Sequence, residues 1–204
     1  MRTGTALAAW LLLPLSAAAQ LLCALGSGAS SYKPAADQRP TSDTLQLAGR
    51  VNAALKSICA DQCPTMALFR NATAPNVMLI ADAGQAKLVY SPQFFAAAYD
   101  SFGDDGIVAI MAHEIGHALD ATLGAAWIRN SWTPELRADS WAGCVLARIE
   151  QGKIDPGPSG LEPGLAALAK YPSPAHPGWA MRLPVIRAGY TQCGGEGAKF
   201  DKRK

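Results

Sequence analysis

One segment of the chain constrains the fold more than any other, because it reads as a helix that is apolar on almost all of its faces. Residues 106–124, GIVAIMAHEIGHALDATLG, keep this pattern until Gly124, and Asp104 or Asp105 can cap the start of the helix. A helix with apolar residues on nearly every side belongs in the interior of a protein. The chain has 204 residues, of which 50% are hydrophobic, so a single domain holds enough apolar material to cover such a helix.

The segments around this helix predict an α+β fold. A helix capped by Asp43 places most of its apolar residues, up to Ile58, on one face. Three short strand-like runs follow, at residues 66–69, 77–81 and 86–90. The turn at residues 82–85 predicts a hairpin between the last two runs. Other helical segments lie at residues 92–103, 133–152, 161–170 and 178–189. We therefore expect buried helices packed against a small antiparallel sheet.

The beginning of the chain is typical of a secretory signal peptide. Arg2 precedes an apolar run from Ala6 to Leu25, and the small residues Ala17–Ala19 offer a cleavage site. The competing interpretation is an uncleaved anchor, because the apolar run is just long enough to cross a bilayer. We expect four parts: signal peptide 1–19, linker 20–43, folded domain 44–193 and disordered tail 194–204. The expected location is periplasmic or secreted, with membrane association only through an uncleaved leader.

The cysteines fit an oxidising compartment of this kind. Cys59 and Cys63 lie four residues apart at the end of a predicted helix, so they could form a disulfide. Cys144 would then pair with Cys193, whereas buried free thiols are the alternative. The net charge is only +2, without a long block of one sign, which argues against a nucleic-acid partner.

The buried helix carries two of the three histidines of the chain, in the sequence His113-Glu114-Ile115-Gly116-His117. A spacing of four residues puts both imidazoles on one helix face, where their nitrogens can bind the same metal ion. Glu114 can then reach a water on that ion and act as a general base. Shuffling this composition produces the H-E-x-x-H pattern roughly once in a thousand trials. The alternative is a histidine pair that is hydrogen-bonded in the core, which is costly without a cation.

A catalytic zinc ion usually has three protein ligands, so a third ligand is needed from a neighbouring element. We expect Glu135, in the first turn of the next helix, to provide it. The competing interpretation is an ordinary acidic residue that interacts favourably with the helix dipole. Asp139 favours the ligand role, because it follows by four residues on the same helix face and can accept the spare N–H of a liganding histidine.

HEIGH followed by ELRAD resembles the gluzincin metallopeptidases, whose pattern is H-E-x-x-H with a downstream E-x-x-x-D. In particular, the chain is similar to the prenyl-protease-like family of zinc endopeptidases, over about residues 45–190. Two further features resemble this family: the strand pair within residues 76–90, and His176-Pro177 with Arg182. The chain departs from the family in having no transmembrane helices after its leader, which makes membrane-embedded substrates less expected.

The resemblance implies a zincin-like fold and zinc bound by His113, His117 and Glu135. It implies Glu114 as general base and Asp139 as the residue that orients a ligand. His176 and Arg182 would lie over the open side of the metal, where donors stabilise the negative charge that develops on the scissile carbonyl. A neutral His176 could instead occupy the open metal position, and an exposed histidine at a helix start is the remaining alternative.

The expected function is a zinc-dependent endopeptidase that acts on extended or unfolded envelope proteins. Backbone pairing with an exposed strand at residues 86–90 would hold such a polypeptide. A zinc-bound assembly factor or chaperone without peptidase activity would share every motif. A purely structural zinc site fits less well, because such sites close with four ligands, commonly cysteines.

Overall fold

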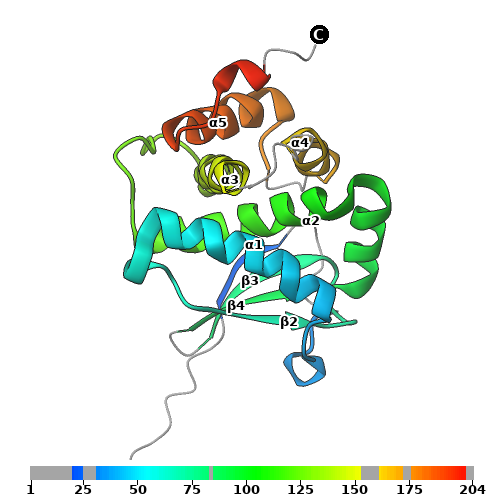
Figure 1. The fold of residues 1–204 in the computed structure, drawn as a ribbon. Coiled ribbons are helices and arrows are strands. Elements are labelled where there is room, and N and C mark those ends of the chain that lie inside the picture. Colours follow the sequence, from blue (N-terminus) through cyan, green and yellow to red (C-terminus); the bar gives the residue numbers. More distant parts are fainter. Residues whose placement is uncertain (1–19, 25–30, 83–84, 153–160, 172–175, 201–204) are drawn as a thin grey trace, which may run out of the picture.

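Helices stack in layers over one face of a small sheet (Figure 1). The computed structural model describes residues 20–24, 31–82, 85–152, 161–171 and 176–200. Their content of helices and strands confirms the expected α+β class.

The described residues contain five α-helices. α1 (Ser42–Cys59) and the second half of α2 (Pro92–Thr122) lie side by side over the sheet (Figure 1). α3 (Pro134–Gln151) packs on α2, and α5 (Trp179–Gln192) packs on α3. α4 (Leu161–Lys170) packs on α2. The second half of α2 is therefore covered by the sheet and by three helices.

The sheet is mixed rather than antiparallel, which corrects the prediction. β2 (Met66–Arg70), β3 (Val77–Asp82) and β4 (Gln85–Tyr90) form its three-stranded part, and β1 (Gln20–Ala24) adds a fourth strand. The strand order is β1-β3-β4-β2. β3 and β4 form the predicted antiparallel hairpin, but β4 returns between β3 and β2 and therefore pairs parallel with β2.

This strand order overturns one expectation about substrate binding. β4 pairs with β3 along one edge and with β2 along the other, from residue 86 to residue 90. Both rows of backbone groups are thus occupied within the sheet. Residues 86–90 cannot be the exposed strand that holds a polypeptide.

α2 contains the helix that was expected to lie in the interior. Ser91 caps it by accepting a hydrogen bond from the backbone N–H of Phe94, and Pro92 occupies the first turn. The helix is kinked at Gly103, whose φ of 62° and ψ of −161° are not helical, at the position where the sequence predicted a break. Every residue from 106 to 119 is buried, which confirms the expected interior position.

The two faces of the sheet bury different apolar groups. Val77, Leu88 and Tyr90 face the helices and belong to the main core. Met78, Ile80 and Val89 lie on the opposite face and form a smaller cluster, with Tyr32 and Phe69 packed against it. The alternation follows from the period of two along a strand. The outer face is thus covered in part by the segment before α1.

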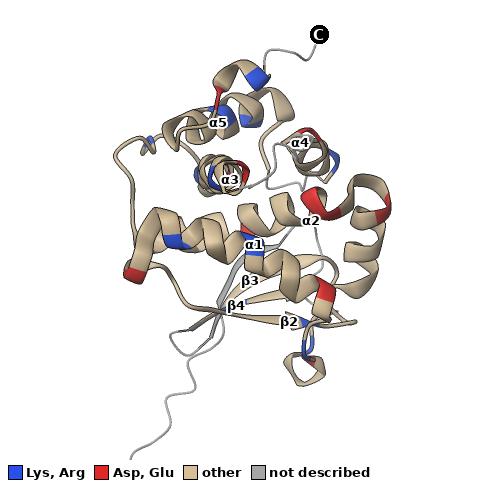
Figure 2. Cartoon of the chain, in the orientation of Figure 1, with Lys and Arg blue, Asp and Glu red and all other residues tan. Residues whose placement is uncertain are grey.

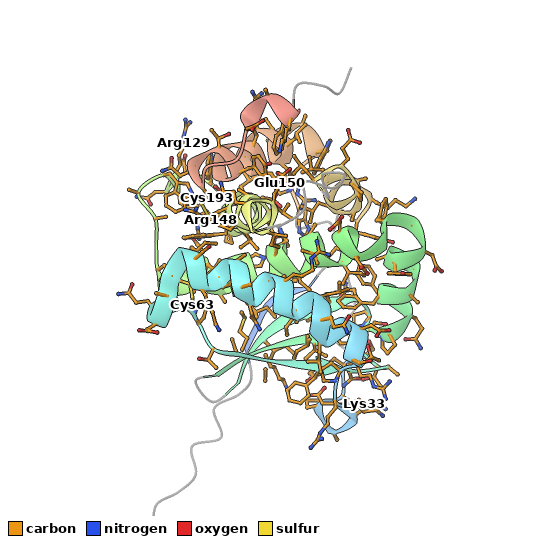
Figure 3. The ribbon with its side chains drawn as sticks, in the orientation of Figure 1. Lys33, Cys63, Arg129, Arg148, Glu150 and Cys193 are labelled. Atoms are coloured by element: carbon orange, nitrogen blue, oxygen red, sulfur yellow. A yellow bond between two sulfur atoms is a disulfide. The ribbon has the colours of Figure 1, made fainter. Side chains whose placement is uncertain are left out.

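Both predicted disulfides are present. Cys59 and Cys63 form one near the end of α1, and Cys144 of α3 bonds to Cys193 at the end of α5. The backbone oxygen of Cys193 accepts a hydrogen bond from Gln151 Nε2 at the C-terminal end of α3, at 3.1 Å; Figure 3 labels Cys193 beside this helix. The second disulfide therefore joins α3 to the end of α5, and both helices contribute residues to the site described below.

The predicted linker and tail contribute structure to the fold. Within residues 20–43, Gln20–Ala24 form β1 and Pro34–Ala36 form a short 3-10 helix. At the other end, residues 197–200 form another 3-10 helix, and Phe200 packs on Tyr190 of α5. Residues 201–204 and the predicted signal peptide, 1–19, lie outside the described residues.

Charged residues of both signs are scattered over the helices in this view of the described chain (Figure 2). Within the described residues, no helix combines the length and apolar character needed to span a membrane.

Candidate metal centre

His113 and His117 lie one helical turn apart on the face of α2 that meets α3. The side chain of His113 is fully buried, and His117 retains an exposed fraction of only 8%. Their ring centroids are 5.1 Å apart and the ring planes are nearly perpendicular, at 86°. The expected convergence of the two imidazoles is therefore present.

Glu135 reaches the same point from the first turn of α3. This helix starts as the sequence predicted, with Thr133 accepting a hydrogen bond from the Leu136 N–H and Pro134 at the first helical position. Glu135 Oε2 lies 3.3 Å from His113 Nε2 and 3.7 Å from His117 Nε2. All three potential ligand atoms lie within 4.8 Å of one another.

These separations suit a metal ion. With zinc bonds of 2.0–2.2 Å, two ligands of a tetrahedral site lie roughly 3.4 Å apart. The distances from Glu135 to the two histidines bracket that value. By geometry and by ligand type, the three side chains therefore form a group that could hold a metal ion.

The close approach of α2 and α3 depends on Gly116. A Cβ atom at this position would lie 2.5 Å from the backbone oxygen of Ala138, which is well inside contact distance. Glycine therefore allows the two helix backbones to touch within one turn of the ligands. Gly116 is one of the two unspecified positions in H-E-x-x-H, and the motif alone does not reveal this role.

Asp139 lies behind His113, one turn further along α3 than Glu135. The fully buried carboxylate accepts a hydrogen bond from His113 Nδ1 through Oδ1, at 2.9 Å. An ionised carboxylate can only accept, so the Nδ1 proton is fixed there and His113 Nε2 faces the ligand cluster. The position agrees with the expected orienting role.

Arg182 of α5 holds this aspartate in place. Its Nε donates to Asp139 Oδ2 at 2.7 Å, and its Nη2 donates to Oδ1 at 2.8 Å. Its Nη1 donates to the backbone oxygen of Leu168 in α4, at 2.9 Å. Arg182 is 1% exposed. It contacts Asp139, behind His113, whereas the resemblance implied a position over the open side of the metal.

His176 reaches the ligand cluster itself. Its Nε2 lies 2.7 Å from Glu135 Oε2 and 3.2 Å from His113 Nε2. The residue is 9% exposed, which argues against an ordinary surface histidine at a helix start. A third imidazole nitrogen, which is the fourth potential ligand atom, thus faces the point where His113, His117 and Glu135 meet.

The electrostatics of the cluster favour bound positive charge. Burial opposes a charge on His113, but hydrogen bonds to Asp139 and Glu135 raise its pKa to about 10. Burial, together with the nearby His113, lowers the pKa of His117 to about 4 and keeps its imidazole neutral. Burial would raise the pKa of Glu135, yet hydrogen bonds to His113 and His176 hold it well below its usual range.

One buried nitrogen of the cluster lacks a partner within the described part of the chain. His117 Nε2 is buried and has no hydrogen-bond partner among the described residues. Such an atom is costly in a protein interior, and a cation coordinated to it would remove the cost. Two imidazoles and one carboxylate are among the donor sets that catalytic zinc sites use. The residues present therefore fit a zinc ion.

Glu114 is buried next to His113 on α2, with an exposed fraction of 0%. The negative charge of the Glu114 carboxylate lies close to His113 and contributes to the raised pKa of that histidine. The sequence predicted the grouping of His113, His117 and Glu135, but it did not predict the bidentate Asp139–Arg182 pair or the contact at Gly116. Both depend on which helices become neighbours.

Comparison with known proteins does not extend this description: no protein-family profile, curated protein or solved structure gives a significant match to the chain.

Proposed function

We propose that the protein is a zinc-dependent endopeptidase of the gluzincin type. The observation that carries the proposal is the meeting of His113, His117 and Glu135 at one buried point, with Glu114 adjacent on the same helix. The order and spacing of HEIGH and ELRAD add support through the resemblance to gluzincins. The expected substrates are extended or unfolded polypeptides.

His113, His117 and Glu135 would hold the metal. When bound, zinc supplies a Lewis acid that polarises the scissile carbonyl and lowers the pKa of water toward about 7. Glu114 accepts the proton of the attacking water on its carboxylate and then donates it to the departing amine. Its position next to a ligand, without a place in the ligand set, suits this role.

Asp139 and Arg182 act on the ligand rather than on the substrate. Asp139 fixes the Nδ1 proton of His113, and Arg182 fixes both oxygens of Asp139. The buried guanidinium keeps the aspartate ionised, since the pKa of Asp139 is lowered by Arg182 and His113 despite its burial. These contacts orient the His113 imidazole and link α5 to α3.

Two roles are proposed for His176, and they have opposite effects on the rate of cleavage. As a donor it would stabilise the negative charge on the scissile carbonyl oxygen. As a fourth ligand it would close the site and hold the protein idle. The 3.2 Å between His176 Nε2 and His113 Nε2 is close to the spacing of two ligands and supports the second role, whereas the 2.7 Å contact with Glu135 Oε2 is a hydrogen-bond distance.

The periplasm or the extracellular space is the proposed location. The two disulfides fit an oxidising compartment and agree with the predicted leader. A polypeptide partner is expected there, and no feature of the site suits a nucleic acid.

Zinc content and cleavage of casein, measured on wild type and Glu114→Gln, test the proposal. We expect one zinc per chain in both proteins, chelator-sensitive cleavage by wild type, and a loss of roughly 10²- to 10⁴-fold in the variant. Equal cleavage by both proteins would remove Glu114 from the mechanism.

His176→Ala in the same assay separates the two roles of this histidine. Slower cleavage indicates a donor, and faster cleavage indicates a blocking ligand. A zinc-loaded wild type that never cleaves casein, before or after this substitution, would instead favour a non-proteolytic assembly factor or chaperone. The convergence of four side chains favours this assembly factor or chaperone as the second candidate function, because zinc sites without catalytic activity have four protein ligands and no open position.

A further inference from the structure

The first described strand, β1, covers the outer edge of β3. It pairs antiparallel with β3, from Gln20 opposite Ala81 to Ala24 opposite Met78. The pairing shifts register between Leu21 and Cys23, whereas β3 and β4 pair without interruption. β1 begins directly after the predicted cleavage position, so it stays in the chain when the leader is removed.

The edge under β1 is the sheet edge that runs beside the metal-binding helix. α2 contacts β3, β4 and β1. Toward the opposite edge of the sheet, which is formed by β2, α1 packs beside α2 over the same face (Figure 1). One end of β2 is also occupied, because Gln38 and Arg70 exchange two backbone hydrogen bonds of 2.9 and 3.0 Å. An extended polypeptide would therefore reach the site along β3.

A sheet edge binds an extended peptide through main-chain hydrogen bonds and adds it as a new strand. Without β1, β3 would present such an edge in the described part of the sheet. β1 provides the same kind of pairing from within the chain. It therefore occupies the place that a polypeptide would take, with a backbone geometry that is close to that of a bound peptide.

We propose that β1 is an internal competitor for the peptide-binding edge of β3, and that substrate binds there only when β1 is displaced. This inference rests on the proposed peptidase function, because it assigns how that site receives its substrate. It also replaces the exposed strand that the sequence wrongly predicted at residues 86–90.

The expected size of the effect follows from competition within one chain. A tethered segment acts at an effective concentration in the millimolar range, so a short peptide at micromolar concentration competes poorly with it. If β1 is paired in about 99% of molecules, the apparent affinity for peptide is about 100-fold weaker than the affinity of the open edge.

A reversible crosslink tests the inference in the full chain. Gln20 and Ala81 are Cα partners across β1 and β3, so cysteines at both positions can form a disulfide that locks the pair. The variant Gln20→Cys/Ala81→Cys also carries Cys23→Ser, to prevent other pairing, and Glu114→Gln, to separate binding from cleavage. Cys23→Ser/Glu114→Gln alone is the matched control for any effect of the reductant on the native disulfides.

Binding is measured by fluorescence anisotropy with a labelled ten-residue fragment of casein. We expect the oxidised, locked protein to bind at least 10-fold more weakly than the reduced protein, with no such change in the control. The same pair with Glu114 intact should cleave casein at least 10-fold faster after reduction.

Equal binding by the locked and reduced proteins would overturn the inference, even if both cleave casein. An absence of binding in both states would overturn it as well. Tighter binding after reduction without cleavage by the Glu114-containing protein would support the inference and contradict the peptidase proposal. The two proposals can therefore fail separately.

Discussion

Two polar clusters in this protein, one partly buried and one largely buried, lie on opposite sides of the sheet and differ in how their charges are balanced. On the outer face, the carboxylate of Asp37 accepts hydrogen bonds from Tyr32, Lys87 and Asn71 at 2.7 to 2.9 Å. On the helical side, His113, His117 and Glu135 bring ligand atoms together, and His117 Nε2 has no hydrogen-bond partner among the described residues.

The difference separates a structural network from a binding site. A carboxylate surrounded by donors is satisfied by the protein itself, and the ammonium of Lys87 balances its charge. In the second cluster, His117 Nε2 has no hydrogen-bond partner among the described residues and lies 3.7 Å from Glu135 Oε2, so a cation would complete the group. Removing a member of the first cluster should therefore change stability, and removing a member of the second should change metal binding.

The largest effect is expected for Glu135→Ala. Removing a ligand should weaken zinc binding by more than about 100-fold, because loss of a residue that only orients a ligand already costs 10- to 100-fold. Chelator competition followed by metal analysis measures this. Glu162→Ala, an exposed acidic residue of α4, is the control and should keep its zinc. A Glu135→Ala protein with stoichiometric zinc would show that another residue is the third ligand.

Asp139→Asn should have the next largest effect. It leaves the geometry nearly unchanged but no longer forces the proton of His113 onto Nδ1, so zinc affinity should fall by about 10- to 100-fold. It also leaves the Arg182 guanidinium buried beside a neutral side chain, which should cost about 3–5 kcal/mol of unfolding free energy. Zinc competition and urea unfolding measure the two losses. Unchanged affinity would contradict the orienting role.

The smallest effect on the metal is expected for Asp37→Asn. The ammonium of Lys87 would lose its carboxylate partner in a site where both side chains are 12–13% exposed. Stability should fall by about 1–3 kcal/mol while zinc content and casein cleavage stay unchanged. Urea unfolding beside Asp61→Asn, an exposed aspartate near the end of α1, checks this. Loss of zinc in Asp37→Asn would mean that the two clusters are coupled.

Much of the helical part of the fold could be predicted from local chemistry. The cap at Thr133, the break at Gly103 and the interior position of residues 106–119 follow from residue types and their periodicity. The same holds for the strand segments, because β-type residues alternate between turns. Local patterns, however, carry no information on which strands become neighbours, so the parallel pairing of β2 with β4 was not predictable.

The site divides in the same way. A spacing of four residues on a helix fixes a shared face, so His113 with His117, and Glu135 with Asp139, could be predicted as pairs. The roles of more distant residues depend on tertiary packing. Arg182 lies against Asp139 because α5 packs on α3, and His176 reaches Glu135 from the segment before α5.

The central claim is that one metal ion lies between α2 and α3. A crystal of the zinc-loaded Glu114→Gln protein, with anomalous diffraction measured at the zinc absorption edge, tests it most directly. We predict a single strong peak about 2.0–2.2 Å from His113 Nε2, His117 Nε2 and an oxygen of Glu135. A zinc peak elsewhere, or none within bonding distance of these three atoms, would contradict the account.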